Sequence, residues 1–191
     1  MALQQTTFKE FFGKVFIAHN QFCIWLSINN ELAKLDQQAT VKNDLFWQII
    51  LPTLQQSWIL ALARILDKPS YNQKKERSRL SLDYISEQLA DPEVSSLIEE
   101  VKQKNKDAIE SIRHHRKFIA HNPINELRDP QIATMGALFD DLEKTIIKMG
   151  KRIDNGFRNN SLYGDTQNQA ELSAKRLFEA IMDWHKKTNL F

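Results

Sequence analysis

The densest group of chemically capable side chains in the sequence lies in residues 112–122, IRHHRKFIAHN. These residues include three of the chain's five histidines and three cations, namely Arg113, His114, His115, Arg116, Lys117 and His121. A guanidinium neutralises phosphate, and an imidazole gives or takes a proton near neutral pH. The segment therefore contains the residue types that phosphate binding and proton transfer require.

Arg116 has the spacing of a residue on a core-facing helix. It lies four residues after Ile112 and three before Ile119, so helical geometry places it on the same stripe as these apolar side chains. A buried guanidinium needs an anionic partner. Asp67 is one candidate partner, and the phosphate of a ligand is the other. We interpret Arg64 and Asp67 as a structural pair that orients the region around Arg116.

His121 lies at the expected end of the same helix, because Pro123 disfavours helical geometry in the residue before it. The negative end of the helix dipole favours a protonated imidazole, so His121 is a candidate general acid or base. Five residues separate it from Arg116, which corresponds to about 140° around an ideal helix. The two side chains therefore converge either where the helix loosens at its end or between two chains of a dimer.

An arginine that neutralises phosphate and a histidine that moves protons suffice for metal-independent RNA cleavage, in which the 2′-hydroxyl attacks the adjacent phosphorus. The polar neighbours are candidate RNA contacts: Arg113, His114, Lys117 and Asn122. Cations near a helix C-terminus are also favourable through the helix dipole alone. His115 lies on the apolar stripe and is interpreted as a packed or interface histidine that supports the site. No carboxylate or thiolate stands at a metal-ligand spacing from these histidines, so we expect neither a metal nor a cofactor.

The periodicity of apolar residues predicts the helices that position this segment. They cover about residues 6–36, from a Thr6 or Thr7 cap, and about 43–67, 81–90, 93–122, 130–155 and 169–187. Pro52 should kink or divide the second helix, because it lacks an N–H and crowds the preceding turn. Ser81 and Asp91 are expected N-caps. Residues 68–79 form a basic connection, either simply solvated or able to steer RNA, and residues 155–168 a polar loop.

Composition places the chain in the all-α class. The length of 191 residues favours one domain, residues 1–191. The scarcity of Gly and Pro, 5 of each, favours a bundle of about five to six helices. The net charge is only +2, so any RNA contact depends on local clustering of cations. Cys23 is the single cysteine, which excludes an internal disulfide and fits a reducing cytoplasm. We expect no signal peptide and no membrane span, since Pro, Gln and Arg interrupt the apolar residues 50–66.

The segment RKFIAH, from Arg116 to His121, resembles the Arg-x4-6-His signature of HEPN domains, a superfamily of small helical bundles. Upstream, SWILALARILDKPS followed by LSLDYISEQL is similar to the abortive-infection branch of that superfamily. The resemblance covers about residues 55–122. It implies a HEPN-like up-and-down bundle and a metal-independent endoribonuclease of toxin or phage-defence type.

The resemblance also implies a homodimer in which Arg116 and His121 of both chains face one shared basic cleft. Arg116 would stabilise phosphate charge, and His121 would transfer a proton. A cognate antitoxin, often a small nucleotidyltransferase, is an implied partner. The family usually has a small polar residue directly after the arginine, whereas this chain has Lys117. The alternatives are a catalytically inactive HEPN-like bundle that binds RNA, nucleotide or a protein, and a plain helical interaction domain.

Overall fold

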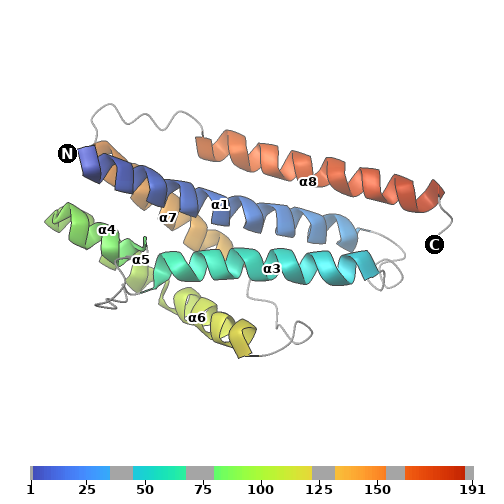
Figure 1. The fold of residues 1–191 in the computed structure, drawn as a ribbon, viewed down its shortest axis with the longest axis horizontal. Helices are drawn as coiled ribbons and strands as arrows, with labels where there is room; N and C mark the ends of the chain where they lie inside the picture. The colour runs from blue at the N-terminus through green and yellow to red at the C-terminus, as the bar shows by residue number, and fades with distance from the viewer. Residues whose placement is uncertain (1, 35–44, 68–79, 122–131, 154–161, 188–191) are drawn as a thin grey trace. The chain divides into compact units, whose positions relative to one another are not determined.

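A computed structural model describes residues 2–34, 45–67, 80–121, 132–153 and 162–187. This part of the chain contains no strand and seven helices: α1 (Ala2–Ala33), α3 (Leu45–Leu66), α4 (Leu82–Leu89), α5 (Pro92–Lys104), α6 (Lys106–His121), α7 (Ile132–Ile153) and α8 (Leu162–Lys187) (Figure 1). The predicted all-α class is confirmed. The expected basic connection at residues 68–79 lies outside the described residues.

The prediction of one helix over residues 93–122 is wrong, because the chain forms α5 and α6 as two helices that meet at Asn105 (Figure 1). Asn105 has φ −109° and ψ 26°, outside helical geometry. Its N–H donates to the carbonyl of Val101 over 3.0 Å, and its own carbonyl accepts from Ile109 over 3.0 Å. One residue therefore closes α5 and opens α6.

Three other predicted boundaries also need correction. The first helix begins at Ala2 and ends at Ala33, instead of beginning at a Thr6 or Thr7 cap. Of the two effects predicted for Pro52, division of the helix is not observed, because Pro52 lies inside α3 between the buried Trp47 and Trp58. The last helix begins at Leu162, so residues 162–168 are helical and do not belong to a polar loop. Extending a packed helix costs little per added residue, which lets poor helix formers join it.

The predicted caps around α4 and α5 are confirmed. The Ser81 hydroxyl accepts a hydrogen bond from the N–H of Tyr84 over 3.3 Å and so caps α4. The Asp91 carboxylate accepts from the N–H groups of Glu93 and Val94, at 2.9 and 3.4 Å, and Pro92 stands at the first position of α5. These side chains satisfy N–H groups that have no partner within the helix. They set the start of both helices.

The contacts divide the described helices between two compact units. The first unit takes α1 up to Ile17, α3 from Ile59 onward, and all of α4, α5, α6 and α7. Within it α5 packs against α4, α6 and α7. Each helix of this group buries apolar side chains, among them Leu62, Ile85, Ile98, Ile112, Leu138 and Leu142. The candidate site segment belongs to this unit.

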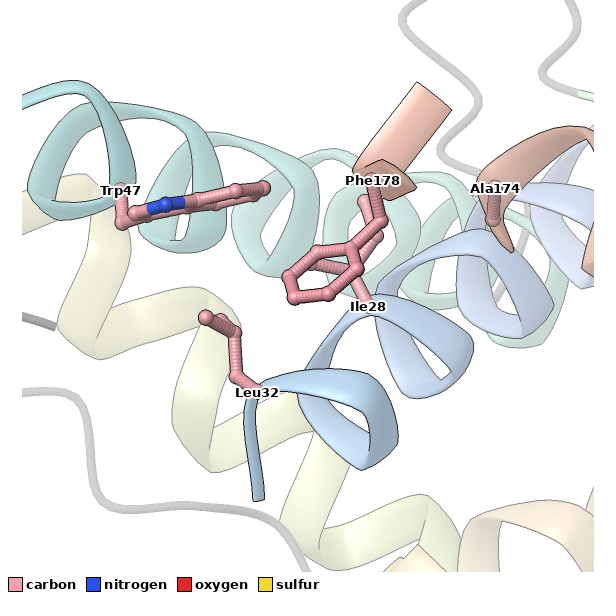
Figure 2. Close-up of a cluster of buried hydrophobic side chains, with 5 residues drawn as sticks. All are labelled: Ile28, Leu32, Trp47, Ala174 and Phe178. Carbon is pink, nitrogen blue, oxygen red and sulfur yellow. The ribbon is translucent and has the colours of Figure 1, made fainter. Parts of the chain in front are cut away.

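The second unit takes α1 from Ala18, α3 up to Trp58, and α8. Its core joins side chains from all three helices, namely Ile28, Leu32, Trp47, Ala174 and Phe178. Figure 2 shows the rings of Trp47 and Phe178 pointing toward the aliphatic side chains of Ile28 and Leu32. The centroids of the two rings lie 5.6 Å apart. Aromatic contact at this distance adds to the stabilisation that burial of the apolar surface provides.

By length and composition, α3 is the one described helix that could cross a membrane, and 39% of its most apolar stretch is buried within the protein. The core helix of a soluble protein passes the same test, so this is weak evidence for a membrane span.

Candidate functional site

Two arginines of α6 hold the C-terminal end of α3. Arg113 donates from Nη2 to the carbonyl of Leu66 over 3.1 Å. Arg116 pairs through Nη1 with the carboxylate of Asp67, the residue that follows α3. The sequence allowed two anionic partners for Arg116, Asp67 or the phosphate of a ligand. In the structure the partner is Asp67. The last carbonyls of a helix lack partners within the helix, so the Arg113 bond also satisfies one of them.

The Arg116 guanidinium is less buried than its spacing predicted. Its side chain is 35% exposed, whereas that of Asp67 is 14% exposed. Ile112 is fully buried one turn earlier, but Ile119 is only half-buried. The apolar stripe of α6 therefore leaves the core within the last turns of the helix. The arginine lies at the edge of the core, where it pairs with a carboxylate and its side chain is partly exposed.

His115 is tied to its own helix. Its Nδ1 lies 2.8 Å from the carbonyl oxygen of Ser111 and 3.4 Å from the Ser111 hydroxyl. A carbonyl only accepts, so Nδ1 carries the hydrogen in the shorter contact. The ring of His114 lies edge-on to that of His115, with 6.2 Å between the centroids. His115 is half-buried and His114 is exposed, which gives the two neighbouring histidines different surroundings.

The other predicted contacts on α6 lie on its exposed surface. Arg113, His114 and Lys117 are exposed, and so is Arg64 on α3. Arg113 and Lys117 are one helical turn apart and share a face. Together with the partly exposed Arg116, they give this end of α6 a positively charged surface.

The α-helical geometry of α6 continues through His121. Regular geometry separates Arg116 and His121 by about 140° around the helix axis. Loosening of the helix before His121, one of the two predicted routes to convergence, is therefore not observed. The side chain of His121 and all of Asn122 lie outside the described residues.

A buried polar cluster that the sequence analysis missed lies at the start of α6. Asn105 donates from Nδ2 to Asp141 of α7 over 2.9 Å and to the carbonyl of Val101 over 3.1 Å. Lys104 donates to the other oxygen of Asp141 over 2.8 Å. Asn105 and Asp141 are 7% and 8% exposed. The signal was an acidic residue, Asp141, between the core residues Leu138 and Leu142.

The surroundings of Asp141 keep it ionised. Burial raises the pKa of the carboxyl group, but hydrogen bonds from Lys104 and Asn105 and the charge of Lys144 outweigh burial, and the net shift is downward. A carboxylate with these partners fixes the point from which α6 departs. None of these hydrogen bonds involves Arg113 or Arg116.

Among the described residues, no group of three His, Cys, Asp or Glu side chains is placed to hold a metal ion. No protein-family model, curated protein or solved structure matches the chain. The fold and the site thus define a class in structural terms alone, an all-α protein with a cationic helix end fastened to a neighbouring helix.

Proposed function

We propose that the chain is a metal-independent endoribonuclease of the toxin or abortive-infection type, HEPN-like in its fold, with a composite active site at a homodimer interface. The observation that carries the proposal is the state of Arg116. Its guanidinium pairs with Asp67, and its side chain is still one-third exposed, on a helix that extends to His121. A fixed, accessible guanidinium stabilises phosphate charge at little cost in side-chain entropy.

In the proposed reaction the 2′-hydroxyl of RNA attacks the adjacent phosphorus, and the bond to the 5′-oxygen of the next nucleotide breaks. His121 transfers a proton in this step, as the base for the hydroxyl or the acid for the leaving oxygen. The products are a 2′,3′-cyclic phosphate and a free 5′-hydroxyl. Arg116 stabilises the charge that develops on the phosphorane oxygens.

The exposed cations on α6 support RNA as the substrate. Arg113, His114 and Lys117 would contact neighbouring phosphates, with Asn122 as a further contact. The regular helix between Arg116 and His121 supports a dimer, since each active site would combine the arginine of one chain with the histidine of its partner. A cytoplasmic location, which the single cysteine Cys23 favours, and a restraining antitoxin of the small nucleotidyltransferase type, which the HEPN resemblance implies, complete the proposal.

The test is cleavage of single-stranded and structured RNA by the wild-type chain in EDTA, compared with Arg116→Ala and His121→Ala. Of these three chains we expect only the wild type to cleave, with 2′,3′-cyclic phosphate ends identified by mass spectrometry. Arg176→Ala is the matched control, because it removes an exposed arginine from α8. Equal cleavage by wild type and His121→Ala would trace the activity to a contaminant and overturn the proposal.

A second candidate function is an inactive HEPN-like bundle that binds RNA, nucleotide or a protein. The contacts of α6 with the end of α3 favour it, because Leu66 and Asp67 account for Arg113 and Arg116 without any substrate. Lys117 directly follows Arg116, where the HEPN family usually has a small polar residue, and this also favours an inactive bundle. This candidate predicts RNA affinity without cleavage, and an affinity that His121→Ala leaves unchanged.

A further inference from the structure

The end of α3 presents two different acceptors to α6. The Leu66 carbonyl, which accepts from Arg113 over 3.1 Å, is neutral. The Asp67 carboxylate, which pairs with Arg116, is an anion. Each of the two arginines needs a hydrogen-bond acceptor at the end of α3. The Leu66 carbonyl shows that a neutral acceptor can hold one of them. The negative charge at Asp67 therefore does something that anchoring alone does not require.

The exposures of the two partners show which member of the pair a ligand reaches more easily. Asp67 is the shielded member of the pair, at 14% exposed, and Arg116 is open at 35%. We therefore expect a phosphate to contact the more exposed member of the pair, Arg116. A guanidinium carries five N–H donors, more than one carboxylate can use, so Arg116 can bind both anions at once. The two anions repel each other across the arginine.

We propose that Asp67 restrains Arg116 as a phosphate-binding group, so that the site binds the phosphodiester of RNA more weakly than its cations alone would allow. The inference rests on the proposed function, since it concerns the same site and the same substrate class. Asp67 has two opposing effects on Arg116. It orients the guanidinium, and its negative charge offsets the positive charge that would attract a phosphate. A second anion then gains less from binding there.

The decisive substitution is Asp67→Asn. The amide keeps an oxygen that accepts from Nη1 of Arg116, so the orientation of the guanidinium is preserved while the negative charge is removed. If Asp67 restrains Arg116, the variant binds RNA more tightly. If Asp67 only positions Arg116, the variant binds RNA equally well or more weakly. The two interpretations predict opposite signs, which makes the direction of the change the readout.

The experiment measures the dissociation constant of a short single-stranded RNA by fluorescence anisotropy at low salt, with all variants made in the His121→Ala chain so that no cleavage occurs. We expect Asp67→Asn to bind about five-fold more tightly, the scale of one partly exposed charge pair. The gain should shrink as salt increases, because screening weakens the repulsion. Thermal unfolding of each variant establishes that the chain is folded.

Three further variants isolate the effect. Asp83→Asn removes the same charge from a carboxylate paired with Lys102 and should leave RNA affinity unchanged. Asp67→Glu keeps the charge and should bind as the parent does. Adding Arg116→Ala to Asp67→Asn should abolish the gain, because the restraint acts through that arginine.

An Asp67→Asn chain that binds RNA no more tightly than the parent overturns the inference, as does a gain that persists without Arg116. The proposed function fails separately, if the chain with His121 intact never cleaves RNA. If Asp67→Asn binds RNA more tightly but the chain with His121 intact does not cleave RNA, the inference about Asp67 holds and the function is that of an RNA-binding module. Absence of RNA binding in every variant overturns both.

Discussion

The side chain of Asn105 donates a hydrogen bond to the Asp141 carboxylate over 2.9 Å, and both residues are buried. Asn105 lies between α5 and α6, so this pair stands at the start of the helix with the candidate site. An asparagine inside a helix competes with the backbone for hydrogen bonds, which makes it a natural break point once a partner is present. Two residues far apart in sequence thus set where α6 begins.

Replacing Asn105 by Ala should lower the free energy of unfolding by about 1–3 kcal/mol, because it removes a donor from a buried carboxylate. Urea unfolding followed by circular dichroism measures the change. Asn29→Ala is the control, since Asn29 also bonds the carbonyl four residues earlier, Trp25, over 2.8 Å but is only partly buried. Equal losses for the two variants would contradict a special role for the contact with Asp141.

The stability of the protein should fall in acid partly through Asp141. Burial raises the pKa of its carboxyl, but the hydrogen bonds and charges around it hold the pKa below the ordinary 3.8. A depressed pKa in the folded state contributes stability that is present above the unfolded pKa and is lost as pH falls through the folded one. Unfolding in urea at several values between about pH 5 and pH 2 should therefore show a shallower acid dependence for Asp141→Asn than for the wild type. Parallel curves would exclude this contribution.

Removing the Ser81 cap should destabilise α4. Ser81→Ala deprives the N–H of Tyr84 of its acceptor, and we expect a loss of about 1 kcal/mol, against a few tenths for Ser81→Gly. Ser96, exposed on the surface of α5, provides the control, because Ser96→Ala should be neutral or slightly stabilising through helix propensity. Denaturant midpoints rank the three variants. A neutral Ser81→Ala would show that the cap does not contribute.

Phe178 and Leu177 are neighbours on α8 with opposite surroundings. Phe178 is 5% exposed in the core with Trp47, and Leu177 is 52% exposed. Phe178→Ala should cost about 3–5 kcal/mol through lost burial and a cavity, whereas Leu177→Ala should stay within about 0.5 kcal/mol. Tryptophan fluorescence during urea unfolding reports both. Similar losses for the two variants would contradict the packing of α8 in Figure 2.

The ion pair between Arg116 and Asp67 should add little to stability, because the arginine is 35% exposed and solvent screens the charges. A double-mutant cycle of Arg116→Ala and Asp67→Ala should give a coupling energy of at most about 1 kcal/mol. Arg116→Ala would then stay folded, so a loss of RNA cleavage would report on the reaction. A coupling of several kcal/mol would identify the pair as a structural element first.

Local signals predicted much of the fold and part of the site. The caps at Ser81 and Asp91 were predictable because a side chain bonds the backbone two or three residues away, within the same stretch of sequence. The position of Arg116 between two apolar residues indicated a guanidinium in need of an anion. Its exposure was not predictable, since that depends on where the core ends.

The sequence by itself determined the all-α class, the caps at Ser81 and Asp91 and the cationic character of residues 112–122, because periodicity and side-chain chemistry act over a few residues. Only the tertiary structure decided the break at Asn105, whose partner Asp141 lies 36 positions away, and the choice of Asp67 for Arg116, across 49 positions. Contacts at such separations form when helices pack, and packing can overrule helix propensity by burying a polar group beside its partner.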